Sequence, residues 1–187
     1  MSLQDLQNCF VSYQSVICHC LHTTPVVFYV KMSVCIYGKT MKIWIDGDAC
    51  PGAIKDILFK AAIRTKTEAI LVANHFSKLP ASPYIKRLLV GSGFDVADNT
   101  IVENIKVEDL VITADIPLAD AVIRKNALAL NPRGRLYTEN NIKEALALRD
   151  FHTSLRDSGL QHGGAAKISA ADIRQFANQL DRLLSKK

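Results

Sequence analysis

The chain has 187 residues, of which 49% are hydrophobic and 22% are charged, and it carries a formal net charge of +5. This length suits one domain with a sizeable hydrophobic core, and the composition excludes general disorder. No run of about 18 uncharged apolar residues occurs, so the sequence predicts no membrane-spanning helix.

The first forty residues differ in composition from the rest of the chain. Residues 1–40 contain three charged side chains and four of the five cysteines, whereas residues 41–187 contain 38 charged side chains. They lack the features of a secretory signal and of an arginine-rich mitochondrial presequence. We interpret residues 1–40 as a non-native or unstructured extension, and residues 41–187, which open directly on a strand-like segment, as one domain. Cys50 is then the only native cysteine, which indicates a reducing cytoplasm and no disulfide framework.

From Met41 onward, short apolar runs alternate with segments of helical periodicity. Strands are predicted at 43–45, 69–73, 94–97, 110–114 and 127–130. Helices are predicted after Pro51, around 101–105, over 118–125, and in two C-terminal segments that begin near Thr138 and Ser169. Residues 84–90 fit either a strand or a helix. The alternation predicts an α/β fold with a mostly parallel sheet, helices on both faces and helices at the C-terminus.

Aspartates follow several of the predicted strands. Asp46 and Asp48 follow the first strand, Asp98 follows 94–97, Asp115 follows 110–114, and Asp120 lies about one and a half helical turns further on. Parallel strands present their carboxyl ends at one edge of a sheet, where ligands bind, so we expect these carboxylates to meet there. Carboxylates brought together repel one another unless a cation intervenes. Because no histidine or thiolate accompanies them, the set predicts a Mg²⁺ or Mn²⁺ site.

Helix capping is the alternative role for each of these aspartates. For any one of them capping is the more common role, but Ser, Thr and Asn cap helices equally well, so a set made only of Asp favours the metal site. Asp95 and Asp109 are interpreted as solvated turn charges, and Thr113 as a packing residue. Cys50 stands at a predicted helix N-terminus, where the helix dipole can lower a thiol pKa, but no histidine lies nearby in the sequence to act as a base.

Two polar loops supply candidates for contact with phosphate. These substrate-binding candidates are Asn74, Ser77 and Lys78 after the second strand, and Arg133 and Arg135 after the last strand. Guanidinium groups bind phosphate in a forked geometry, although solubility is an equally good explanation for exposed basic residues. From residue 41 onward, 21 basic and 17 acidic side chains give a net charge of +4, which permits binding to nucleic acid without requiring it.

Four sequence motifs stand out along this domain. They are Asp46-Gly47-Asp48-Ala49-Cys50-Pro51, Gly93-Phe94-Asp95-Val96-Ala97-Asp98-Asn99, Val111-Ile112-Thr113-Ala114-Asp115-Ile116-Pro117-Leu118-Ala119 and Asn131-Pro132-Arg133-Gly134. Together they resemble the YaiI/YqxD family of uncharacterised bacterial proteins. That family is similar to PIN-like domains, whose clustered acids bind divalent metal and cleave single-stranded RNA. The resemblance implies a three-layer PIN-like sandwich with Asp46, Asp98 and Asp115 as the catalytic acids.

Three hypotheses about function follow from these residues. The first is a Mg²⁺- or Mn²⁺-dependent nuclease or phosphodiesterase that acts on RNA through the clustered aspartates. The second is a phosphatase like the haloacid dehalogenases, with Asp46 as nucleophile and Asp48 as general acid, although no clear phosphate-binding lysine lies near Thr113. The third is a nucleic-acid-binding protein without catalytic turnover.

Overall fold

Strands and helices alternate along the chain, as a parallel sheet with crossover helices requires. The computed structural model describes residues 41–93, 95–158 and 167–185. Within them the elements are β1 (Ile43–Asp46), α1 (Gly52–Thr65), β2 (Ala69–Ala73), β3 (Ile85–Leu89), α2 (Val96–Asn104), β4 (Leu110–Ile112), α3 (Ile116–Arg124), β5 (Leu128–Leu130), β6 (Leu136–Tyr137), α4 (Glu139–Asp157) and α5 (Ala170–Leu184). The predicted extension, residues 1–40, lies outside this described part.

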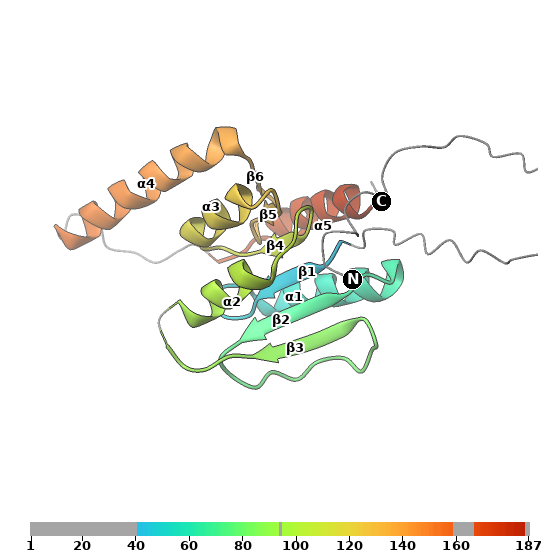
Figure 1. Cartoon of the computed structure of the whole chain (residues 1–187). Coiled ribbons are helices and arrows are strands. Elements are labelled where there is room, and N and C mark those ends of the chain that lie inside the picture. Colours follow the sequence, from blue (N-terminus) through green and yellow to red (C-terminus); the bar gives the residue numbers. More distant parts are fainter. Residues whose placement is uncertain (1–40, 94, 159–166, 186–187) are drawn as a thin grey trace, which may run out of the picture. The chain divides into compact units, whose positions relative to one another are not determined.

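The strands of the described residues form one sheet in the order β3-β2-β1-β4-β5-β6 (Figure 1). Strands β1 to β5 pair in parallel, and the short β6 pairs antiparallel with β5. The chain builds outward from β1 to β3 and then returns to place β4 on the other side of β1. The order therefore reverses between β1 and β4, which is where open α/β sheets bind ligands.

Alternating side chains of the central strand enter two separate cores. Ile43 and Ile45 are fully buried against residues of α1 and α5. Trp44 points to the opposite face, where it belongs to a core with residues of α2, α3 and α4. Since successive strand residues face opposite sides of a sheet, one strand of four buried residues serves both cores. The described residues thus form three layers, which confirms the predicted α/β class with helices on both faces.

The strand predicted at 94–97 is wrong. Val96 is the first residue of α2, and Asp95 precedes it with a left-handed φ of 57°. In the sheet, β1 pairs with β2 on one side and with β4 on the other, and β3, β5 and β6 take the outer positions. None of these strands includes residues 95–97. Asp98 consequently lies in the first turn of a helix. The ambiguous segment 84–90 is the strand β3, and the two-residue β6 was not predicted.

A buried carboxylate lies at the amino ends of the central strands. Asp109 is only 3% exposed and accepts hydrogen bonds from the Lys42 backbone N–H (2.9 Å), the Trp44 Nε1–H (3.1 Å) and the Lys106 backbone N–H (2.9 Å). The interpretation of Asp109 as a solvated turn charge is therefore wrong. Its carboxylate fastens the start of β1 to the turn that precedes β4.

The helix starts at Thr138 and Ser169 are confirmed. The Ser169 hydroxyl accepts from the Asp172 backbone N–H (3.1 Å), and the Asp172 carboxylate accepts from the Ser169 backbone N–H (2.9 Å). Thr138 has the equivalent arrangement with Asn141. These reciprocal bonds satisfy N–H groups that a helix start leaves without partners. Across the described residues, none of the helices has the length and apolar character that crossing a membrane requires.

Candidate functional site

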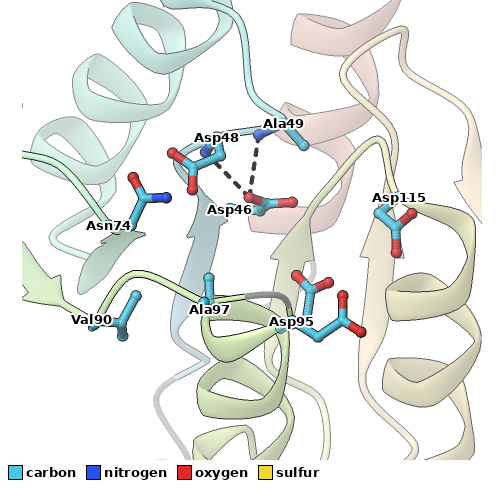
Figure 2. A pocket seen from close by; sticks show the side chains of 11 residues that line it. Asp46, Asp48, Ala49, Asn74, Val90, Asp95, Ala97 and Asp115 are labelled. Atoms are coloured by element: carbon cyan, nitrogen blue, oxygen red, sulfur yellow. Dashed lines mark hydrogen bonds between the residues drawn. The ribbon is translucent and has the colours of Figure 1, made fainter.

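A cavity of about 340 Å³ opens at the carboxyl ends of the central strands, at the point where the strand order reverses. Its lining includes the carboxylates of Asp46, Asp48, Asp95, Asp98 and Asp115, together with the Asn74 amide. Figure 2 shows Asp48 and Asn74 on one side and Asp115 on the other, with Asp46 between them. Among the described residues, no lysine, arginine or histidine lines this cavity. We call it the acidic cavity.

Asp46 is the most rigidly held of these acids. Its side chain is buried, and one carboxylate oxygen accepts hydrogen bonds from the backbone N–H groups of Asp48 and Ala49, both at 3.2 Å (Figure 2). The other oxygen accepts a hydrogen bond from the Thr113 hydroxyl at 2.8 Å. These contacts fix the carboxylate at the end of β1 and also set the path of the loop that carries Asp48.

Thr113 joins the two strands that flank the point of reversal. Its hydroxyl is fully buried, donates to Asp46 and accepts from the Asp115 backbone N–H at 2.9 Å. The sequence-based interpretation as a packing residue missed this role. A signal existed, because a hydroxyl at the end of an apolar strand needs a hydrogen-bond partner once it is buried.

Asp115 combines two of the roles considered from the sequence. It is the N-cap of α3, where one carboxylate oxygen accepts from the Leu118 backbone N–H at 3.0 Å. The same side chain lines the acidic cavity. Asp48 is more exposed and pairs with the His75 ring at 3.2 Å. Capping and a place in the cavity are thus compatible, since a carboxylate has two oxygens.

The acids influence one another electrostatically, as the raised pKa of Asp98 indicates. Partial burial, together with repulsion from Asp46, Asp115, Asp95 and Asp48, raises the pKa of Asp98 to about 6. Carboxylates from the loop after β1, from the start of α2 and from the loop after β4 therefore act on the same group. Burial is the largest cause of this raised pKa, and the negative charge of the neighbouring carboxylates adds to it.

The donor chemistry of the acidic cavity can be tested against a metal ion. In the described part of the chain, no three His, Cys, Asp or Glu side chains converge closely enough to form a complete metal site. Mg²⁺ seldom needs such a site, because it keeps several waters and is held by one or two carboxylates together with substrate phosphates. The available carboxylate oxygens fit this partial ligation.

Comparison with known proteins places the chain in a family. A sequence model described as the uncharacterized YaiI/YqxD family matches residues 44–186. The chain belongs to the YaiI/YqxD family. It is 60% identical to a UPF0178 protein of Shewanella loihica and 58% identical to one of Shewanella pealeana, each over 146 residues that cover 78% of this chain and 97% of the relative. A UPF0178 protein of Marinomonas sp. is 55% identical over 147 residues, or 79% of this chain and 99% of the relative. No solved structure matches, so the similarity to PIN-like domains stays a prediction.

The fold of this YaiI/YqxD protein brings four of the five predicted metal ligands together and separates the fifth. Asp46, Asp48, Asp98 and Asp115 line the acidic cavity. Asp120 does not line it and instead pairs with Arg124 one turn along α3, at 2.7 Å. Asp95, interpreted from the sequence as a turn charge, is exposed as expected but is also a lining residue. Its position three residues before Asp98, at a helix start, was the available signal.

The candidates for phosphate contact are mostly elsewhere. Asn74 lines the acidic cavity, whereas Ser77 and Lys78 lie further along the same loop. Arg133 pairs with Asp172 at 2.8 Å, and the Arg135 guanidinium lies 5.9 Å from the centre of the Tyr137 ring. The structure therefore places Arg133 and Arg135 outside the acidic cavity, in contacts that tie the loop after β5 to neighbouring elements.

A second cavity, of about 500 Å³, adjoins the first between α2, α3 and α4. The two adjoin at Asp95, Asp98 and Asp115, which line both, and together we call them the groove. Arg149 of α4 is the one basic residue among the described residues that line the second cavity. Sequence reasoning did not single out Arg149 for a binding role, because a helical arginine gives no indication of which surface it faces.

Cys50 is not a reactive thiol. It is 4% exposed, and burial raises its pKa to about 12, outweighing the opposing effect of Lys55. The suggestion that the helix dipole lowers this pKa is wrong, because desolvation of the thiolate dominates when the sulfur is packed into the core. Burial and the raised pKa therefore argue against a thiolate mechanism for Cys50 at neutral pH.

Proposed function

We propose that this YaiI/YqxD protein is a Mg²⁺- or Mn²⁺-dependent nuclease or phosphodiesterase that acts on RNA. The observation that carries the proposal is that five carboxylates line one open cavity whose described lining contains no basic side chain. A phosphodiester brings further negative charge, so this cavity can accept it only with a cation present. A bound divalent cation stabilises charge on phosphoryl oxygens and lowers the pKa of bound water.

The residues of the chain would divide the work as follows. Asp46 and Asp115 are the main candidate ligands, because hydrogen bonds already fix both side chains at the cavity. Asp48 and Asp98 would act directly or through water. Arg149, at the far end of the groove, is suited to hold a neighbouring phosphate, since a guanidinium binds phosphate with two parallel hydrogen bonds.

The phosphatase hypothesis is less well supported. It requires an Asp46 oxygen that is free to attack phosphorus. Both oxygens of Asp46 accept hydrogen bonds, and the side chain is 4% exposed. A cation needs only the lone pair that Thr113 leaves on one oxygen, whereas attack on phosphorus needs open access to that buried oxygen.

The test is cleavage of a mixed pool of RNA and single-stranded DNA in Mg²⁺, in Mn²⁺ and in EDTA, with Mn²⁺ binding measured by calorimetry. We expect Asp115→Asn and Asp46→Asn to abolish cleavage and to weaken Mn²⁺ binding at least tenfold, because the loss of even an outer-shell partner commonly costs about tenfold in metal affinity. Asp120→Asn is the matched control, because Asp120 lies on the same helix as the Asp115 cap but outside the cavity. Equal Mn²⁺ binding by all four proteins would refute the proposal. Metal-independent RNA binding without cleavage would instead support a binding protein.

A further inference from the structure

The loop between β2 and β3, which begins at the cavity-lining Asn74, presents an exposed aromatic ring. Phe76 is 76% exposed, the highest value among the large hydrophobic side chains of the described residues. Two residues before it, Asn74 lines the cavity, and the intervening His75 pairs with Asp48. Since consecutive Cα atoms are 3.8 Å apart, Phe76 lies within about 8 Å of Asn74 along the backbone.

The ring of Phe76 is held in place by a neighbour from the sheet. The Arg87 guanidinium of β3 lies 3.9 Å from the ring centre, in a cation–π contact. Arg87 also donates a hydrogen bond to the Ser77 carbonyl, which ties the loop to the strand. One face of the ring is therefore supported by a cation while the side chain stays largely in solvent. Single exposed phenylalanines are common and need no explanation, but this one is also held in orientation by a guanidinium.

We propose that Phe76, backed by Arg87, is a stacking platform for a nucleobase of the RNA strand whose phosphate lies at the acidic cavity. The proposal rests on the proposed function and adds a substrate-positioning residue to it. An aromatic face stacks on any base, so the platform contributes affinity and register without sequence preference.

Binding of short RNA oligonucleotides to the full chain tests this assignment. The probes are a fully based RNA and RNAs with one abasic position placed in turn along the strand, in Ca²⁺ in place of Mg²⁺ to limit cleavage. We expect Phe76→Ala to weaken binding of the based RNA roughly tenfold to a hundredfold, the range for loss of one base–aromatic stack. One abasic position should weaken wild-type binding similarly and leave Phe76→Ala almost unaffected. Phe76→Trp should restore affinity, and its fluorescence should be quenched by RNA.

The matched control is Phe151→Ala, which removes a phenylalanine that is 57% exposed on α4, away from the loop between β2 and β3. Unchanged affinity in Phe76→Ala, or an abasic penalty equal in both proteins, would overturn the platform even if Asp115-dependent cleavage were observed. Failure of the wild-type protein to bind any of the RNAs would also overturn it. If no acid proved necessary for cleavage while the abasic pattern held, the platform would stand and the metal-dependent reaction would fall.

Discussion

Replacing Asp98 with Asn removes the carboxylate whose pKa is raised by burial and by the other acids of the acidic cavity. The pKa of Asp98 is about 6 in the folded chain, against 3.8 for the unperturbed group, because of burial and four neighbouring acids. A difference of about two pKa units corresponds to roughly 3 kcal/mol. Because the side chain is only partly buried, solvent screening reduces this to about 1 kcal/mol. We expect Asp98→Asn to stabilise the metal-free protein by that amount above pH 6.

The pH dependence gives this prediction its sign. The folded chain holds the Asp98 proton more tightly than the unfolded chain, so the wild-type protein loses stability as the pH rises from about 3.8 through 6. The advantage of Asp98→Asn should therefore be largest at pH 7.5 and vanish near pH 4. Urea unfolding in EDTA at these two pH values measures it.

Two further results decide whether this reasoning holds. Asp120→Asn makes the same chemical change outside the cavity, where it removes an ion pair with Arg124, and should not stabilise the protein. Added Mn²⁺ should stabilise the wild-type protein more than Asp98→Asn. A loss of stability in Asp98→Asn at pH 7.5 in EDTA, or a gain that does not depend on pH, would refute the argument.

Two other substitutions test the hydrogen bonds at the two ends of the central strands β1 and β4. Asp109→Ala removes the acceptor of three donors, including the buried Trp44 Nε1–H, and should lower the free energy of unfolding by about 3 kcal/mol or more in urea titrations. Thr113→Val deletes the hydroxyl that binds Asp46 and should weaken Mn²⁺ binding about tenfold or more by calorimetry, whereas Thr113→Ser should retain most of it. Full Mn²⁺ affinity in Thr113→Val would show that Asp46 needs no such support.

The central strands and the position of the acids could be predicted from the sequence for a physical reason. Buried parallel strands are continuous apolar runs, and β2 coincides with its predicted bounds, Ala69–Ala73. The rule that parallel strands end at one edge then correctly grouped Asp46 with Asp115. Asp98 reached the same cavity by a different route, because it lies in the first turn of α2 and not after a strand. The sequence thus placed Asp98 at the correct cavity although it predicted a strand where the structure has a helix.

What the sequence could not reveal depends on partners that are remote along the chain. Asp109 in a turn looks the same whether it is solvated or accepts a hydrogen bond from Trp44, 65 residues away. Arg149 and Phe76 likewise have no sequence pattern that tells which cavity they adjoin. Asp120 is different, because its partner Arg124 lies only four residues along α3, a spacing at which helical side chains of opposite charge commonly pair.

Two buried aspartates, Asp46 and Asp109, show which feature separates a structural carboxylate from a candidate functional one. Asp46 and Asp109 are similarly buried, at 4% and 3% exposed, and each accepts three hydrogen bonds from neutral donors. Burial and hydrogen bonding therefore do not distinguish them. The difference lies in their neighbours, since Asp46 lines a cavity with four other acids and contributes to the raised pKa of Asp98, whereas Asp109 lines neither part of the groove. Uncompensated charge in an open cavity is a cost to folding that a purely structural role would not explain, and a divalent cation would relieve it.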